Sequence, residues 1–190
     1  MRERFVPRRN SWVARHPVAS DVLVGAIGGA AATWAMTRAT TWLYDRESSA
    51  ARQREDNARG GETAFARAAG RLAGAADVTL DREQRARVGT ALHWTTGIAA
   101  GIGYALARRR WPPIAVGGGL AFGFGFFMLM DEGVNTLFGF TPPPRAFPWQ
   151  AHARGAAGHA VFGVATHLIA RSVDPFRRQL RRQEVLLSTM

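Results

Sequence analysis

A run of seventeen residues without a charged side chain, residues 114–130, constrains the fold of this chain more than any other feature. An arginine triplet and Trp111 precede the run, and Asp131 and Glu132 follow it directly. A helix of this length and apolarity is close to what is needed to cross a hydrocarbon core of about 30 Å. Basic and aromatic residues at one end and carboxylates at the other are typical of membrane interfaces. The run therefore predicts an integral membrane protein.

Three further apolar segments predict an all-α fold, a bundle of four transmembrane helices. We expect these helices at 18–44, 88–107, 114–133 and 153–170. The remaining segments are a basic tail, a polar loop, an arginine-rich turn, a proline-rich loop and a second basic tail, at 1–17, 45–87, 108–113, 134–152 and 171–190. Between residues 64 and 76, small and apolar side chains recur at helical spacing, which predicts a short amphipathic helix in the first outer loop.

The distribution of arginine predicts the orientation of this bundle. The formal net charge is +11, and all 25 basic residues counted as Lys and Arg are arginines. They concentrate in the two tails and the 108–113 turn, whereas the 45–87 loop is almost neutral and the 134–152 loop is poor in arginine. The positive-inside rule then places both termini in the cytoplasm. We expect a multi-pass protein of a bacterial inner membrane, with its basic tails on anionic lipid headgroups and no nucleic-acid partner.

Composition also excludes several kinds of chemistry. The chain has no cysteine, so disulfides, thiolate metal sites and a cysteine nucleophile are ruled out. The three glycines at 117–119 do not form a phosphate-binding loop, because the lysine and hydroxyl residue that such a loop requires do not follow them. With no other nucleophile evident, an enzymatic activity is not expected.

Small residues recur at spacing four in each predicted helix. Such stripes allow membrane helices to approach closely. They predict helix packing, within the chain, in a homo-oligomer or against a membrane-protein partner. The glycines concerned are Gly25, Gly29, Gly97, Gly101, Gly119, Gly123, Gly155 and Gly163.

A set of polar residues shares the faces that are predicted to pack inward, and most lie toward the outer ends of the helices. Lipid cannot satisfy such groups, so we expect them in the interior of the bundle as a polar cluster. The candidate residues are Arg38, His93, Asp131, Glu132, Asn135 and His159.

Four uses of this cluster are open. The plainest is structural: hydrogen bonds between helices, with Arg38 packed between Trp34 and Trp42 and paired with Asp131 or Glu132. The second is a proton- or ion-responsive site, because histidine titrates near neutral pH. The third is a haem or metal site held by His93 and His159, although no attachment motif is present and no cofactor is expected. The fourth is lipid-modifying catalysis, with His159 and Asp131 as a general base pair.

The order of these features resembles the YagU-like family of small, uncharacterised bacterial inner-membrane proteins. The likeness rests on residues 25–34, on His93-Trp94, on the segment 139–143 followed by Pro148-Trp149, and on Gly158-His159. The resemblance implies an uncleaved protein with several membrane spans, and it implies no reaction or catalytic residue. From the polar cluster we expect a small proton-responsive protein that supports envelope homeostasis. The alternatives are a membrane scaffold or accessory subunit, or a haem-binding subunit.

Overall fold

A computed structural model describes residues 16–172 and 174, and within that part of the chain every element is helical and none is a strand. Three long helices are α2 (Pro17–Tyr44), α5 (Arg82–Ala107) and α8 (Trp149–Ser172). A fourth, compound segment consists of η1 (Pro112–Gly119), α6 (Leu120–Phe127), η2 (Met128–Val134) and α7 (Asn135–Leu137). The shorter elements are α3 (Ser49–Arg59), α4 (Ala64–Ala75) and η3 (Pro144–Ala146).

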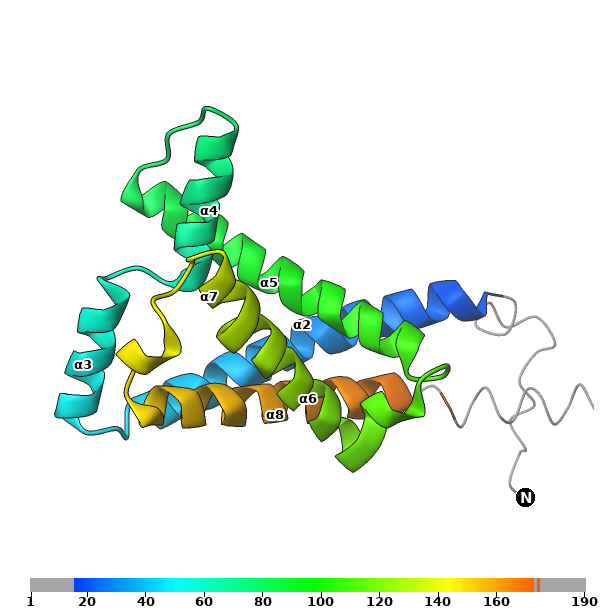
Figure 1. Ribbon diagram of the computed structural model, residues 1–190. Helices are drawn as coiled ribbons and strands as arrows, with labels where there is room; N and C mark the ends of the chain where they lie inside the picture. Colours follow the sequence, from blue (N-terminus) through cyan, green and yellow to red (C-terminus); the bar gives the residue numbers. More distant parts are fainter. Residues whose placement is uncertain (1–15, 173, 175–190) are drawn as a thin grey trace, which may run out of the picture.

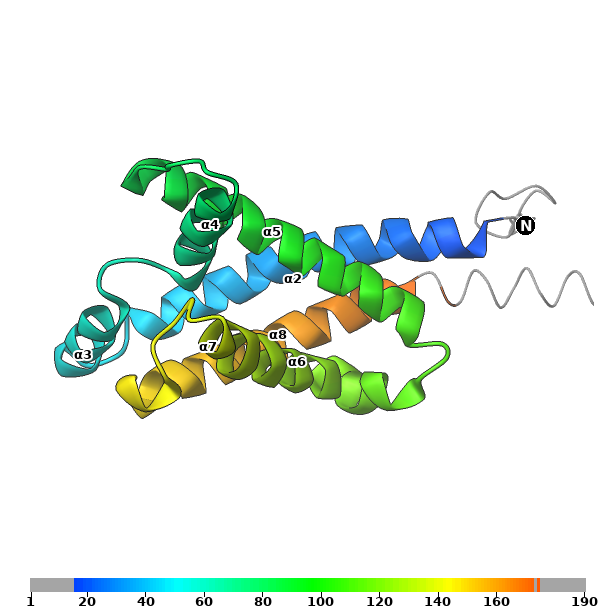
Figure 2. The ribbon, with the colours of Figure 1, turned by 45° about the horizontal axis from the view of Figure 1, so that its top comes forward.

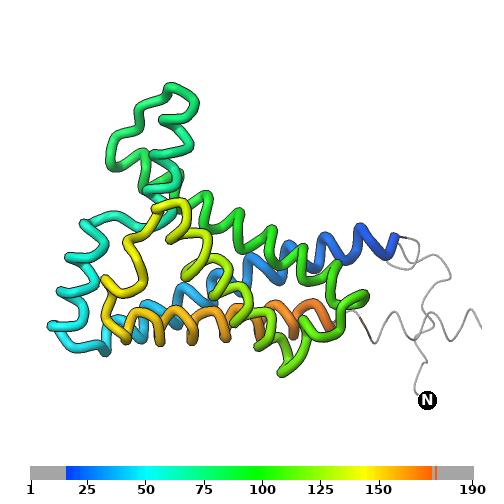
Figure 3. The backbone as a smooth tube through the Cα atoms, in the orientation of Figure 1, coloured from blue at the N-terminus to red at the C-terminus, as the bar shows by residue number. Residues whose placement is uncertain are grey.

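Helix α2 is the central element of the bundle. It packs against both α5 and α8, and α6 packs against the far side of α8 (Figures 1 and 2). The start of α2 and the ends of α5 and α8 converge at one end of the bundle, which we call the tail end (Figure 3). Helix α3 covers the opposite end, which we call the α3 end (Figure 1). The basic tails predicted at 1–17 and 171–190 fall almost wholly outside the described residues.

Within residues 16–172, two helices are long and apolar enough to cross a membrane, Pro17–Tyr44 and Pro112–Leu137. They contain the predicted spans 18–44 and 114–133. The predicted spans 88–107 and 153–170 lie within α5 and α8, which carry more polar residues. In α5 these include the charged turn that begins at Arg82, and in α8 they include Arg154, His159 and His167.

The compound segment is not one uninterrupted α-helix, which corrects the prediction for 114–133. Gly117, Gly118 and Gly119 have φ angles of 65°, 67° and 99°. Residues with a Cβ rarely adopt such angles, and glycine adopts them without strain. The α-helix therefore begins only at Leu120, and farther along it widens into the π-helical turn η2.

The polar loop 45–87 contains two helices, of which only the second was predicted. That helix, α4, packs against the first half of α5, and the pair projects from the bundle (Figure 1). The helix that sequence reasoning missed is α3. Its ends carry recognisable signals, since Ser48 accepts a hydrogen bond from the backbone of Ala51 and Gly60 ends the helix in the left-handed conformation.

The predicted packing glycines lie where two helices of this chain meet. Gly25 and Gly29 on α2 face Gly97 and Gly101 on α5, so closely that an added Cβ on any of the four would collide with the facing helix. Gly119, Gly123 and Gly163 form the corresponding contact between the compound segment and α8. These glycines therefore serve contacts between helices of the same chain.

Candidate functional site

A cavity of about 530 Å³ lies at the α3 end, between α2, α5 and the η2–α7 segment. Residues from α3, α4, the proline-rich loop and the first turn of α8 complete its walls. Four of the six predicted cluster residues line it, and these are His93, Asp131, Glu132 and Asn135. A smaller cavity of about 50 Å³ adjoins it, with His93, Asp131 and Asn135 in both walls and His159 in the smaller one. The structure thus brings five of the six predicted residues together.

The π-helical turn η2 contains both carboxylates of this site. A π-helical turn within an α-helix is frequent at functional positions, because it displaces side chains from the regular helical register. Asp131 accepts no hydrogen bond from any described residue, and its nearest basic neighbour is the Nδ1 atom of His159 at 3.8 Å. Its side chain retains 40% of its exposure while lining the cavity. Asp131 is therefore available to a proton or a ligand.

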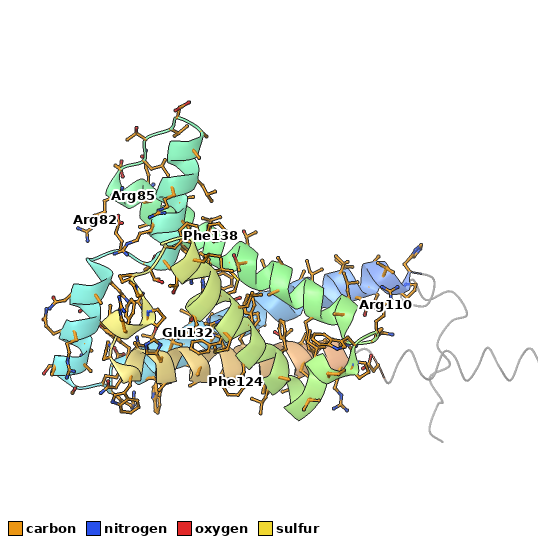
Figure 4. The ribbon with its side chains drawn as sticks, in the orientation of Figure 1. Arg82, Arg85, Arg110, Phe124, Glu132 and Phe138 are labelled. Carbon is orange, nitrogen blue, oxygen red and sulfur yellow. The ribbon has the colours of Figure 1, made fainter. Side chains whose placement is uncertain are left out.

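Glu132 differs from Asp131 because it has a partner inside the chain. His152 places Nδ1 at 2.7 Å from Glu132 and Nε2 at 3.0 Å from the carbonyl oxygen of Pro144. A carbonyl only accepts, so Nε2 must donate, and an ionised Glu132 then requires a proton on Nδ1 as well. Glu132, labelled in Figure 4, and His152 thus form a pair that shares one ionising proton and has no net charge.

The proton positions on the two predicted histidines follow from their partners. Thr37 donates its hydroxyl proton to the carbonyl of Thr33 at 2.8 Å, so it can only accept from His93 Nε2 at 3.4 Å. His93 therefore carries a proton on Nε2 and leaves Nδ1 unoccupied when neutral. In His159, Nδ1 faces the carbonyl of Gly155 at 3.0 Å and must donate to it. The Nε2 atom of His159 is left to accept or release a proton.

The haem alternative does not fit this geometry. The cavity that His93 and His159 share measures about 50 Å³, whereas sites for ligands of drug size occupy several hundred. Among the described residues, no three histidine, aspartate or glutamate side chains are grouped as a metal ion requires.

Arg38 does not join the cluster, which corrects the prediction. Its side chain is exposed and lines neither cavity. None of the ion pairs between described residues includes it, and the guanidinium that lies over the ring of Trp42, at 3.7 Å, belongs to Arg46. Arg38 follows Thr37 directly on α2, and the 100° step between helical neighbours turns it away from the face that carries Thr37 and Thr40.

A buried ion-pair network fastens α3 over the end of the bundle. Arg154 on α8 is buried and donates to Glu47 and to both carboxylate oxygens of Glu55. Glu55 also binds Arg59, a cavity residue, at 2.7 Å. Burial raises the pKa of Glu55, but the hydrogen bonds from Arg154 and Arg59 outweigh burial and the pKa is lowered overall.

A second network closes the tail end. Arg108 holds Asp174 through two hydrogen bonds of 2.8 Å, and Arg109 contacts Asp21 and Asp174. The hydrogen bond to Asp174 raises the pKa of Arg108. Burial raises the pKa of Asp174, but its bonds to Arg108 outweigh burial and lower that pKa overall. Two arginines of the predicted orientation signal therefore also tie α2, α5 and α8 together. Close to this network, the hydroxyl of Tyr104 on α5 is hydrogen-bonded to Nδ1 of His167 on α8.

Sequence reasoning missed His152, Arg59 and the threonines of α2 as parts of the site. His152 lies twenty residues beyond Glu132, at the end of the predicted proline-rich loop 134–152. Thr37 continues the spacing-four stripe of Gly25 and Gly29 on α2, which was interpreted as a packing face, and Thr40 was given no role. Only their common position on the inner face of α2 connects them with His93.

Comparison with known proteins identifies a family without identifying an activity. No curated protein and no solved structure shows a significant match to this chain. One family model matches residues 51–168, the stretch from α3 to α8 that contains most of the cavity wall. Its description is "Protein of unknown function (DUF1440)". Because the match covers more than half of the sequence, the chain belongs to the DUF1440 family.

Proposed function

We propose that this chain is a four-helix, multi-pass protein of a bacterial inner membrane, with both termini in the cytoplasm. The cavity at the α3 end is its proton-responsive site, open toward the outer side, and its role is to support envelope homeostasis. The likeness to the YagU-like family is part of the same proposal.

The distribution of polar and apolar side chains supports the membrane part of the proposal. Buried positions hold Thr33, Asn135, Arg154, His159 and Thr166, whereas large apolar side chains lie on the outside of the same helices. Soluble proteins show the reverse tendency. The outward side chains include Leu23, Ile27, Trp34, Phe124, Met128, Leu129 and Leu168.

The two more polar helices are long enough to span as well. From Val88 to Ala107, α5 has twenty residues without Asp, Glu, Lys or Arg. At 1.5 Å per residue this stretch measures about 30 Å, the thickness of a hydrocarbon core. In α8 the basic residue closest to the outer end, Arg154, is buried between two carboxylates and needs no solvation by lipid. Polar groups turned inward in this way are tolerated in membrane bundles.

A single observation carries the proton-responsive part, namely the contact between Asp131 and His159. Their atoms Oδ2 and Nδ1 lie 3.8 Å apart, and Asp131 has no hydrogen-bond donor of its own. Charges at that separation influence each other's protonation strongly where water is scarce. The pair therefore couples the state of the cavity to pH.

The test is an NMR titration of the His159 ring in lipid nanodiscs, comparing the unaltered chain with Asp131→Asn. We expect the ring signals of His159 to respond to pH and that response to change when the carboxylate is removed. Glu83→Gln, which removes an exposed carboxylate on α5 outside the cavity, should leave the midpoint where it is. A His159 ring that does not titrate, or titrates identically in both proteins, overturns the proposal.

A further inference from the structure

The cavity at the α3 end has the size and lining of a small-molecule site. Its volume of about 530 Å³ is within the range of about 300 to 1,000 Å³ typical of ligand pockets. Such pockets combine apolar and aromatic walls with a few oriented polar groups. Here the aromatic side chains are Phe65, Trp94, Phe127 and Phe147, and threonines, Asn135 and the two carboxylates supply the polar groups.

Among the charged groups that face the cavity, the carboxylate of Asp131 has the weakest compensation. Glu132 is neutralised by His152, and Arg59 is neutralised by Glu55. The Nε2 atom of His93 is hydrogen-bonded to the hydroxyl of Thr37, a bond that the neutral ring can make. Asp131 has no hydrogen-bond donor among the described residues, and its one charged partner there is His159 at 3.8 Å, whose Nδ1 proton is directed to the carbonyl of Gly155. The cavity therefore attracts a cation that can approach Asp131.

An aromatic ring lies beside that carboxylate. A Cβ added to Gly155 would lie 2.8 Å from the ring of Phe127 and 3.5 Å from Oδ2 of Asp131, so the ring and the carboxylate lie close together beside Gly155, and both line the cavity. A carboxylate adjacent to aromatic surface suits an organic ammonium ion, because the charge pairs with the carboxylate while the ring attracts the cation and packs on its apolar body. A metal ion fits this cavity less well, because Glu132 is already paired with His152 and only the carboxylate of Asp131 could serve as a ligand.

We propose that this cavity binds a small organic ammonium ion, with Asp131 as its counter-ion and Phe127 as part of its aromatic wall. This inference gives a ligand class to the site described under the proposed function. It rests on that function in one respect, the opening of the cavity to water on the outer side of the membrane.

Three probes with the same phenyl ring test the proposal: 2-phenylethylamine, 2-phenylethanol and phenylacetate. Calorimetric titration uses the full chain in phosphatidylcholine nanodiscs at pH 7, with empty nanodiscs as the blank. We expect saturable binding of the amine, at least tenfold weaker binding of the alcohol and no binding of the anion. Asp131→Asn should weaken amine binding at least tenfold, whereas Glu83→Gln, which removes the same charge outside the cavity, should not change it.

Equal affinity for amine and alcohol would show an apolar pocket without charge selection and would overturn the proposal. Amine affinity that Asp131→Asn leaves intact, or no saturable binding at all, would overturn it too. If Asp131→Asn does not fold, the comparison of the three probes on the unaltered chain decides by itself. If the amine binds but the titration of His159 is the same with and without the Asp131 carboxylate, only the proton-responsive function is overturned. If the titration depends on Asp131 but the amine does not bind, only this inference is overturned.

Discussion

At the scale of single residues, Gly123 and Gly125 lie two positions apart on α6 in opposite surroundings. A Cβ on Gly123 would collide with the carbonyl of His159, whereas a Cβ on Gly125 would meet nothing within 4 Å. We expect Gly123→Ala to destabilise the protein by about 1–3 kcal/mol, because α6 and α8 must separate to accept the methyl group. Gly125→Ala should be neutral or stabilising by up to about 1 kcal/mol, since alanine favours helix over glycine.

Thermal unfolding in one detergent, followed by circular dichroism, checks this pair. Gly101→Ala and Gly103→Ala on α5 repeat the comparison, because a Cβ added to Gly101 would collide with the backbone of α2 and a Cβ added to Gly103 would meet nothing within 4 Å. Equal stability of Gly123→Ala and Gly125→Ala would show that α6 and α8 do not meet as described.

At the scale of elements, the ion pairs of Arg154 determine whether α3 remains docked. Removing one partner of a buried ion pair costs about 3–5 kcal/mol, because the other charge is left uncompensated. We expect Glu55→Gln to lower the protection of the α3 amides in hydrogen exchange sharply. Asp56→Asn on the same helix changes only an exposed contact with Tyr44 and should alter protection by less than about 0.5 kcal/mol. Unchanged protection in Glu55→Gln would mean that other contacts hold α3.

Acid should release the same helix. The pKa of Glu55 is lowered in the folded chain, so its ion pairs stabilise docking fully above the ordinary value of 4.5, and this contribution disappears as pH falls through the lower folded value. We expect exchange protection of α3, corrected for intrinsic rates, to decrease below about pH 4.5 in the unaltered chain. In Glu55→Gln the decrease at that step should be absent. If the exchange protection of α3 decreases equally in both proteins, a titratable group other than Glu55 causes the decrease.

At the scale of the whole molecule, the absence of cysteine makes the proposed topology directly testable. Single cysteines at Ala75, Arg110 and Leu168 would report on the α4 projection, the arginine turn and the outward face of α8. A membrane-impermeant maleimide should label Ala75→Cys in intact spheroplasts and Arg110→Cys only after lysis. Leu168 is 61% exposed, yet Leu168→Cys should react in neither case, because lipid covers that face. Ready labelling of Leu168→Cys in detergent-free membranes would exclude the span at α8.

Hydropathy and spacing determined much of this protein from the sequence alone. The apolar runs at α2 and at Pro112–Leu137, the helical spacing in α4 and the glycines of the helix contacts depend on local periodicity, which a sequence displays directly. Five of the six cluster residues were predicted because lipid leaves ionisable groups no other place than the interior. The basic tails, the orientation and the activity remain predictions.

Only the tertiary structure decided which polar groups pair. Arg154 bonds with Glu55, ninety-nine positions earlier, Glu132 pairs with His152, and Arg38 points away from the cluster. Such pairings depend on how helices distant in sequence are rotated against each other, and no local pattern records that rotation. The left-handed glycines before α6 and the π-helical turn that carries Asp131 likewise arise where the compound segment must fit against α8. The sequence supplied the polar residues, and packing decided that Asp131 has no hydrogen-bond donor among the described residues and only His159, at 3.8 Å, as a charged partner.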